Sequence, residues 1–320
     1  MAQPYTASTR LAFGLLAAIF AVEVYWAAGR PIGAGEAYLY DRFVRPATRQ
    51  VLASELPDRD VLYSLLEKRS VGLFHVSPFA VRLPALLFGI LYLVSVWQIA
   101  RLLLPQGWWF LLAVVLAGAV PLRGGWLARA DGNGAALALL VCAIWLAIEP
   151  RYLNLIGICL GLSIAARIGF AIPALLIALV LAVRRRWSEW VDRVAIPAVV
   201  VAVILLVLPM SHAHASAEIT PELTENQAIH LQSALAALRG SAGPAPIRIC
   251  AAAAAEPVVN FYRAQHRAGN WERASRNYSS EQFDYYVLWA ADAGWAEQRH
   301  LIAVYRDADF VVAQRPPAAM

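Results

Sequence analysis

The residues best suited to chemistry lie in polar loops between apolar stretches, and the first of them is an acid. The sequence GAGEAY begins at residue 33 and places Glu36 a few residues beyond the first apolar segment. A carboxylate at a membrane surface can act as a general base or bind a divalent cation such as Mg or Mn. The alternative is an ordinary solvated acid at the start of a helix.

A second loop, RGGWLARADGNG at residues 123–134, concentrates arginine, acid and glycine between two apolar segments. Arginine binds phosphate bidentately, and glycine lets the backbone approach a ligand. The loop therefore fits either a lipid phosphate headgroup or a flexible polar turn that lies against headgroups. If a metal is bound, Glu36 and Asp131 are the acids expected to hold it. Arg167, in the middle of a long apolar stretch, is either another phosphate ligand or a snorkelling residue.

The elements that must position these loops are membrane helices. A transmembrane helix needs about 20 predominantly apolar residues. Seven segments approach that length, although several are short. They are residues 10–28, 79–104, 107–122, 134–149, 152–166, 168–183 and 191–211. The first also has the length of a cleaved signal peptide core.

The charge pattern predicts an orientation. Arginines cluster at residues 184–186, and Lys or Arg in short loops marks the cytoplasmic side. This places the N-terminus in the cytoplasm and the loops 29–78 and 123–133 on the outer face. Within the first loop, apolar residues between 56 and 73 recur at helical spacing, with charged residues including Glu67 and Lys68 on the other face. This predicts an amphipathic helix that lies in the interface or packs on an outer domain.

The tail after residue 211 has a different character. We expect a helix that starts at Thr220 and ends near Gly240, strands at 247–252 and 283–290, a helix at 256–267 and a terminal hairpin. The predicted fold is a polytopic α-helical membrane domain at 1–211, with about seven transmembrane helices, followed by a small extracytoplasmic α/β domain at 212–320.

Composition supports this division and excludes other classes. The chain has 320 residues, is 60% hydrophobic and only 15% charged, and carries a net charge of +5. Soluble domains are about 45–50% apolar and about 25% charged. A disordered chain, a coiled coil and a nucleic-acid-binding domain are therefore excluded. The excess positive charge is better explained by topology than by a polyanion site, because much of it flanks apolar runs.

Several motifs resemble the GT-C superfamily of membrane glycosyltransferases, in particular the dolichyl-phosphate-mannose-protein mannosyltransferase-like proteins. SPFAVRLPALLFG at 77–89 resembles a signature of these proteins. GEAYLYDRFVRP at 35–46 resembles their entry to the first outer loop, and ARADGNGAALALL at 128–140 resembles the segment entering their fourth helix. LNLIGICLGLSIAARIGFAIPALLIALVLAVRRR at 153–186 resembles a family hairpin. The resemblance covers about residues 10–211.

The resemblance implies an inverting transferase of the bacterial inner membrane. It would move a sugar from a polyprenyl-phosphate donor to a glycan, lipid or protein acceptor on the outer face. Glu36 matches the second acid of the family's D-E pair, and Asp131 matches an acid of a later loop. Arg82, Arg129 and Arg167 become candidates for binding the donor phosphate.

One departure from the family pattern bears on activity. The position of the family's catalytic aspartate is Gly35 here, and glycine cannot accept a proton. Either Glu36 or Asp41 replaces the lost carboxylate, or the protein is an inactive relative that binds lipid-linked sugars or acts as a scaffold. A transporter is a third alternative, but transporters place broken helices and charges within the membrane. Here the charges gather in the loops.

Overall fold

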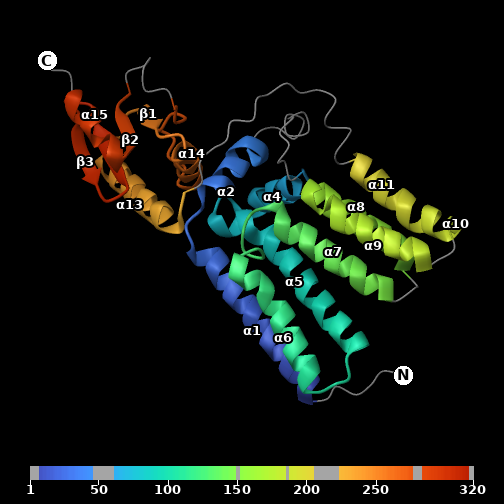
Figure 1. Cartoon of the computed structure of the whole chain (residues 1–320). Coiled ribbons are helices and arrows are strands. Elements are labelled where there is room, and N and C mark those ends of the chain that lie inside the picture. The colour runs from blue at the N-terminus through green and yellow to red at the C-terminus, as the bar shows by residue number, and fades with distance from the viewer. Residues whose placement is uncertain are drawn as a thin grey trace. The chain divides into compact units, whose positions relative to one another are not determined.

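The computed structural model describes residues 7–45, 61–148, 152–184, 187–204, 223–276 and 283–316 (Figure 1). They form two compact units. The first takes its described residues from Met1–Gly29, Ala47–Leu73 and Phe79–Ala217. The second takes them from Arg30–Pro46, Phe74–Pro78 and Glu218–Met320, so the start of the first outer loop belongs with the C-terminal part of the chain. The division at residue 211 had assigned that segment to the membrane domain.

The first unit is helical, and each apolar segment expected to cross the membrane contains helix in its described part. Apart from α4, described below, its helices are α1 (Ala7–Gly29), α5 (Pro78–Leu103), α6 (Trp108–Gly124), α7 (Gly132–Ile148), α8 (Leu153–Ala166), η3 (Ile168–Phe170), α9 (Ala171–Arg184), α10 (Trp187–Trp190), η4 (Val191–Ala195) and α11 (Ile196–Ala202). In the described chain, two of them, α1 and α5, have the length and hydropathy to cross a bilayer individually. About seven crossings therefore remain a prediction for the shorter helices.

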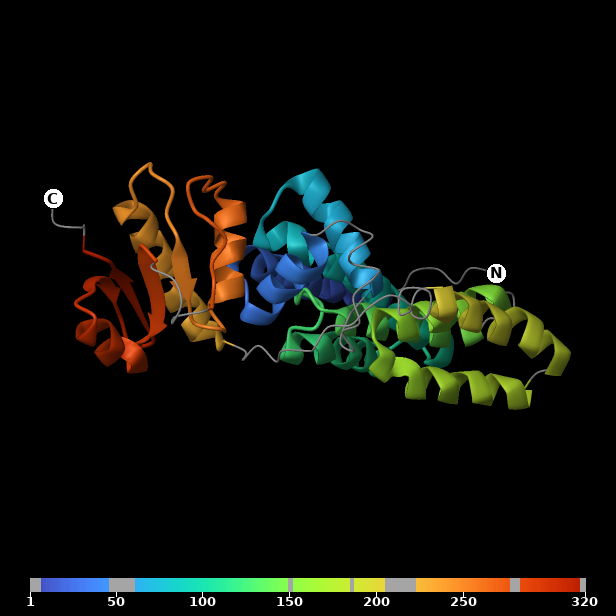
Figure 2. The same ribbon diagram turned by 90° about the horizontal axis from the view of Figure 1, so that it is seen from above.

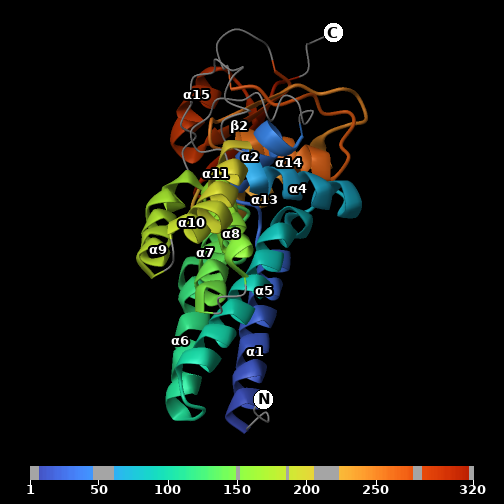
Figure 3. The ribbon, with the colours of Figure 1, turned by 90° about the vertical axis from the view of Figure 1, so that its right-hand side faces the viewer.

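Helices α1, α5 and α6 lie side by side along their lengths (Figures 1 and 3). Their shared core includes Leu16, Leu93, Phe110 and Val114, all nearly inaccessible to solvent. Other helix faces expose large apolar side chains. The exposed residues of α9 include Leu175, Leu176, Leu179, Val180 and Val183. Contiguous apolar patches of this kind are rare on soluble monomers. We therefore interpret these faces as lipid-facing.

Two glycines allow a close helix contact in this unit. A Cβ atom at Gly157 would collide with the backbone carbonyl of Val194, and one at Gly161 would collide with the carbonyl of Ala198. The spacing of four residues puts both glycines on one face of α8. Small residues at this spacing let helix backbones approach in membranes. Close packing of α8 against η4 and α11 therefore depends on glycine at these two positions.

The predicted amphipathic helix is α4 (Val61–Phe74), and its expected first residues fall outside the described chain. It packs on the start of α5. The hydroxyl of Tyr63 donates to the carbonyl of Val81 at 3.0 Å, and Ser70 donates to the carbonyl of Ala80 at 2.5 Å. Glu67, which the spacing assigns to the charged face of this helix, is 0% exposed. The spacing of residues along a helix does not predict that an acid on its polar face is buried by a neighbouring element.

The second unit has a four-stranded sheet in the order β1-β2-β4-β3, built from β1 (Ile249–Ala251), β2 (Tyr285–Trp289), β3 (Ile302–Arg306) and β4 (Phe310–Gln314). β1 and β2 are parallel and joined through α14 (Glu256–Gln265), while β4 is antiparallel to both β2 and β3. These elements can be followed from above in Figure 2. Strands, helix and terminal hairpin confirm the expected α/β organisation. The short helix α15 (Ala293–Gln298) was not predicted.

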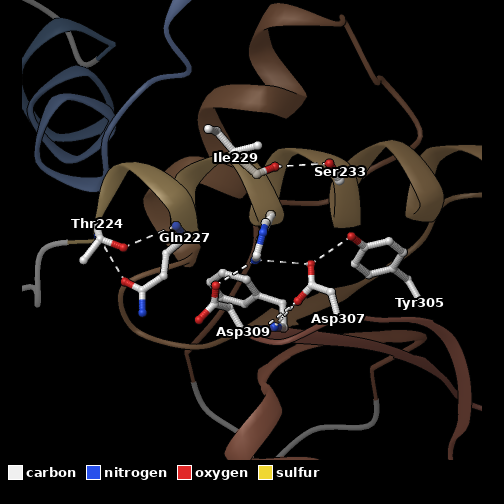
Figure 4. A network of polar contacts seen from close by, with 9 residues as sticks. Thr224, Gln227, Ile229, Ser233, Tyr305, Asp307 and Asp309 are labelled. Carbon is white, nitrogen blue, oxygen red and sulfur yellow. Dashed lines mark hydrogen bonds and ion pairs between the residues drawn. The ribbon is translucent and has the colours of Figure 1, made fainter.

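Helix α13 (Glu225–Ser241) is capped by Thr224, and a reciprocal pair of hydrogen bonds with Gln227 closes its first turn (Figure 4). The predicted start at Thr220 lies outside the described residues. The S/T-x-x-E/Q spacing is the capping-box signature. The predicted end near Gly240 is one residue from the observed end.

A polar network links α13 to the turn between β3 and β4 (Figure 4). Nδ1 of His230 lies 2.7 Å from Oδ2 of Asp309. Asp307 accepts hydrogen bonds from the Tyr305 hydroxyl and from the N–H groups of Asp309 and Phe310. Burial raises the pKa of Asp307, but these bonds and the nearby His230 outweigh burial and leave the pKa below its ordinary value. The network fixes the turn of the hairpin.

The segment after α1 also folds into the second unit, as α2 (Ala34–Leu39) and the π-helical turn η1 (Tyr40–Val44). It packs on α14. The rings of Tyr40 and Phe261 meet edge to face with centroids 5.1 Å apart, and Phe43 is 2% exposed. Both site acids of the first outer loop, Glu36 and Asp41, are carried on this segment.

Candidate functional site

The six candidate residues divide between the two units. Glu36 and Asp41 belong to the second unit, while Arg82, Arg129, Asp131 and Arg167 belong to the first. Within the second unit, the two acids lie five residues apart on the continuous segment of α2 and η1. Within the first unit, the charges of Arg129 and Arg167 both act on Asp131. Three of the four candidates in this unit therefore lie near one another.

Glu36 sits in the first turn of α2 and is 8% exposed. Its Oε2 atom accepts a hydrogen bond from the N–H of Gly33, the cap residue, at 3.0 Å. A glutamate at this position satisfies a backbone donor that the helix itself leaves unpaired. The expectation of a solvated acid is therefore wrong in one respect. Glu36 does lie at a helix start, but it is buried and helps to cap its own helix.

Asp41 lies one turn further on, and arginines bind both of its oxygens. Oδ1 is 3.0 Å from Nη1 of Arg45, four residues along the same segment. Oδ2 is 2.6 Å from Nη2 of Arg273, which is 232 residues away in sequence. The Asp41 side chain is 9% exposed. Its position in a π-helical turn fits the frequent occurrence of such turns at functional sites.

Asp131 immediately precedes α7 and caps it. Oδ1 accepts the N–H of Asn133 at 3.0 Å, and Oδ2 accepts its side-chain amide at 3.2 Å. Burial raises the pKa of Asp131 above its ordinary value, although the bonds from Asn133 and the charges of Arg129 and Arg167 act in the opposite direction. The carboxylate is thus held near positive charge and is partly withdrawn from water.

The loop before Asp131 packs closely against two helices. Leu127 is fully buried and packs beside Gly89 of α5. A Cβ atom at Gly134 would collide with the carbonyl of Trp126, so α7 can approach the loop only with glycine there. The loop is therefore packed against helices, while the phosphate site and the polar turn against headgroups both stay predictions. Arg129 is exposed on this loop.

The remaining arginines have different surroundings. Arg167 lies at the turn between α8 and α9, as the predicted hairpin requires, and its N–H donates to the carbonyl of Ser163. Arg82 is 5% exposed, and its Nη1 atom donates to the carbonyl of Ala27 at 3.1 Å. This bond ties the start of α5 to the last turn of α1. A role for Arg82 in binding phosphate stays a prediction.

Sequence reasoning missed the arginines around Asp41. Arg45 could have been found, since a charge pair four residues apart is a regular feature of helices. Arg263 and Arg273 had no such signal, because they come from α14 and the segment that follows it. The apolar residues Tyr40, Phe43 and Val44 did carry a signal for packing. Their helical spacing indicates a buried face beyond the end of α1.

Two further features bear on ligand binding. A cavity of about 630 Å³ lies on α1 and α5, lined mainly by apolar residues such as Phe13, Leu93 and Trp97. None of the six candidate residues lines it. Among the described residues, no group of three or more His, Cys, Asp or Glu side chains is placed to hold a metal ion. A divalent cation therefore stays a prediction.

Comparison with known proteins finds one family model that matches part of the chain. Residues 58–212 match the family model described as dolichyl-phosphate-mannose-protein mannosyltransferase. The match includes Arg82, Arg129, Asp131 and Arg167 and excludes Glu36 and Asp41. No curated protein and no solved structure matches the chain. The resemblance to GT-C membrane glycosyltransferases is therefore confirmed over this region.

Proposed function

We propose that this chain is a membrane glycosyltransferase of GT-C type that takes a sugar from a polyprenyl-phosphate donor. The acceptor is an envelope glycan, lipid or protein on the outer face of a bacterial inner membrane. The observation that carries the proposal is the family match over residues 58–212. The apolar, outward-facing helices of the first unit support membrane embedding. A cytoplasmic N-terminus follows from the positive-inside pattern.

The proposed reaction needs one base and one group of cations. A carboxylate takes the proton of an acceptor hydroxyl while the acceptor oxygen bonds to the anomeric carbon of the sugar. The bond between that carbon and the phosphate oxygen breaks, and polyprenyl phosphate leaves with the electron pair. Preorganised positive groups stabilise the charge that develops on the phosphate. Arginine suits this role, because its planar guanidinium donates two parallel hydrogen bonds to phosphate.

Glu36 is the proposed base, and Asp41 is the alternative. Both lie on the segment where the family places its catalytic carboxylate. Arginines already bind both oxygens of Asp41. Glu36 instead holds a backbone N–H through its Oε2 atom. Proton transfer to Glu36 therefore leaves the two arginine pairs of Asp41 intact, which favours Glu36 as the base.

Two observations favour a second candidate function. Glu36 fulfils a structural role as a helix cap, and Gly35 occupies the family's usual aspartate position. Both features fit an inactive relative that binds lipid-linked sugars or serves as a scaffold for an envelope enzyme. The two functions differ in whether sugar is transferred.

A transfer assay with matched variants tests the proposal. The full chain in nanodiscs receives radiolabelled polyprenyl-phosphate sugars, with a membrane extract as the source of acceptor. Glu36→Gln keeps a side-chain oxygen for the Gly33 N–H, and glutamine is itself a regular capping-box residue. We expect it to lower the transfer rate by about 10²–10⁴-fold, the usual contribution of a general base. Full transfer by this variant would eliminate Glu36 as the base.

Two further arms complete the assay. Asp41→Asn tests the alternative base in the same way, and a chelator tests the predicted dependence on Mg or Mn. No transfer by the unaltered protein, with donor binding still saturable, would favour the inactive relative. Arg306→Ala serves as a control. Its side chain is 59% exposed on β3, at the sheet edge opposite β1.

A further inference from the structure

Three arginines of the second unit converge on a single carboxylate. Arg45 comes from the end of η1, Arg263 from α14 and Arg273 from the segment after α14. Arg45 and Arg273 bind the two oxygens of Asp41 at 3.0 and 2.6 Å. The charges of Asp41, Arg45 and Arg273 all act on the pKa of Arg263, so Arg263 lies near the other three. Elements far apart in sequence thus bring these side chains together around one acid.

The cluster carries more positive charge than Asp41 neutralises. Three guanidinium groups and one carboxylate leave a local charge of 3 − 1 = +2. Among the described residues, the side chain of Arg263 makes no hydrogen bond or ion pair, while its backbone carbonyl accepts the N–H of Ala268 at 3.0 Å. Burial lowers the pKa of Arg263 first, and repulsion from Arg45 and Arg273 lowers it further, while Asp41 opposes the shift. Repulsion therefore persists in the cluster without a ligand.

The acid on α14, the helix that carries Arg263, does not neutralise the excess positive charge of the cluster. Glu256 pairs with Arg276 and accepts a hydrogen bond from Asn260. Its charge is therefore already matched within α14 and the following segment. By contrast, the side chains of Arg45 and Arg273 are 39% and 54% exposed, so a ligand can reach them from solvent.

We propose that Arg45, Arg263 and Arg273 form a binding site for a phosphate group, in which Asp41 holds the arginines while the site is empty. A phosphate carries the charge and the oxygens that arginine forks recognise. On binding, it would take over guanidinium hydrogen bonds now made by Asp41. The claim that this phosphate belongs to the sugar donor rests on the proposed function. The claim that the three arginines bind a phosphate does not.

The chain supplies a reason to expect a membrane-bound phosphate. Helix α1 ends at Gly29, so Asp41 follows the end of an apolar, span-length helix by 41 − 29 = 12 residues. This covalent connection to a helix that can span a bilayer makes a membrane phosphate the ligand to test, either that of a prenyl lipid or that of a phospholipid headgroup.

Binding measurements on the full chain in phosphatidylcholine nanodiscs test the site. The probe is a short-chain prenyl monophosphate, with the matching prenyl alcohol as the control ligand. We expect Arg263→Ala to weaken binding by about tenfold or more, as for the loss of a hydrogen bond to a charged group. Arg263→Lys should retain part of the affinity, and Arg306→Ala should bind as the unaltered protein does.

Asp41→Asn gives the sharpest result, because it should act in the opposite direction. Removing the carboxylate raises the local charge from +2 to +3, so we expect tighter binding of the phosphate. Weaker binding by Asp41→Asn, or unaltered binding by Arg263→Ala, would overturn the proposal. Because the side chain of Arg263 makes no hydrogen bond among the described residues, its truncation should leave folding intact, which thermal unfolding checks.

Competition identifies the source of the phosphate. Displacement of the probe by inorganic phosphate or by discs with phosphatidylglycerol supports the site and assigns a free or headgroup phosphate. Resistance to both, with loss of binding by Arg263→Ala, supports it and assigns the prenyl lipid. The transfer assay remains separate. Absence of transfer with Arg263-dependent binding refutes the proposed function alone, and transfer with Arg263-independent binding refutes this site alone.

Discussion

The loop at Asp131 and the cluster at Asp41 each combine one aspartate with arginines, but the two aspartates bond differently. Asp131 directs its oxygens to Asn133 at the start of α7, and its arginines act on it through space. Asp41 directs its oxygens to the arginines themselves. The first acid stabilises a helix, and the second acid holds cations in place.

This difference shows that residue type and loop position do not identify a ligand site by themselves. In sequence, the loop at 123–134 and the segment 33–46 each contain two arginines, and the loop has four glycines against two. In the structure, Asp131 faces two nearby arginines, whereas Asp41 faces three and leaves a larger excess of positive charge. The bonds made by each acid separate a capping role from a charge-balancing role.

The largest expected effect concerns the glycine that fixes the Asp131 loop. A Cβ atom in Gly134→Ala would meet the backbone carbonyl of Trp126, which cannot move without shifting the loop. Overpacking of this kind costs about 1–3 kcal/mol. We expect a lower midpoint of thermal unfolding in detergent and weakened capping of α7, while prenyl phosphate binding at the Asp41 cluster stays unchanged.

Gly169→Ala is the matched control for this substitution. Gly169 lies in the η3 turn beside Arg167, and a Cβ atom added there would meet nothing within 4 Å. Equal unfolding midpoints for the two variants would contradict the close approach of α7 to the loop. A loss of phosphate binding by Gly134→Ala would contradict the independence of the two regions.

The second expected effect concerns the Asp131 carboxylate. Asp131→Ala removes the cap of α7 and should cost about 0.5–2 kcal/mol, whereas Asp131→Asn keeps a capping oxygen and should cost less. Because burial raises the folded pKa of Asp131 above 3.8, its ionised form is disfavoured in the folded state. Its contribution to the free energy of unfolding therefore decreases as pH rises through the interval above 3.8.

Thermal unfolding of the unaltered protein and of Asp131→Asn across this pH interval tests the sign. The difference between them should shift in favour of the asparagine variant as pH rises. A shift in the opposite direction would mean that Arg129 and Arg167 outweigh burial. Asp131 would then resemble Asp41, and the contrast between the two regions would disappear.

The sequence predicted elements more reliably than contacts, and the reasons are physical. Long apolar runs and arginine-flanked turns are local signals, so the helices from α5 to α9 and the turn at Arg167 were found in place. Burial of Glu67 was missed, because it depends on the elements that pack around α4 rather than on spacing within the helix.

The candidate site shows the same limit more strongly. Arg45 lies four residues from Asp41, within reach of a helical pattern, but Arg273 lies 232 residues away. Arg273 reaches Asp41 because η1 packs on α14, where the rings of Tyr40 and Phe261 meet edge to face. Long-range packing of this kind brings together charges that neither segment indicates alone. The acids were predicted, and the arginines that distinguish them were not.

The smallest expected effect is the stability change on truncating Arg263. Exposed ion pairs contribute only about 0–1 kcal/mol, and Arg263 makes no ion pair among the described residues. Removing it relieves repulsion with Arg45 and Arg273, so Arg263→Ala should unfold at the same temperature as the unaltered protein or slightly above it. Asp41→Ala should lower the unfolding temperature, because it leaves three arginines without their shared carboxylate. Thermal unfolding at low and high salt measures both, and salt should shrink both differences by screening the charges. Destabilisation by Arg263→Ala that persists at high salt would show that the side chain supports packing, and the cluster would then differ from the Asp131 loop in shape rather than in charge.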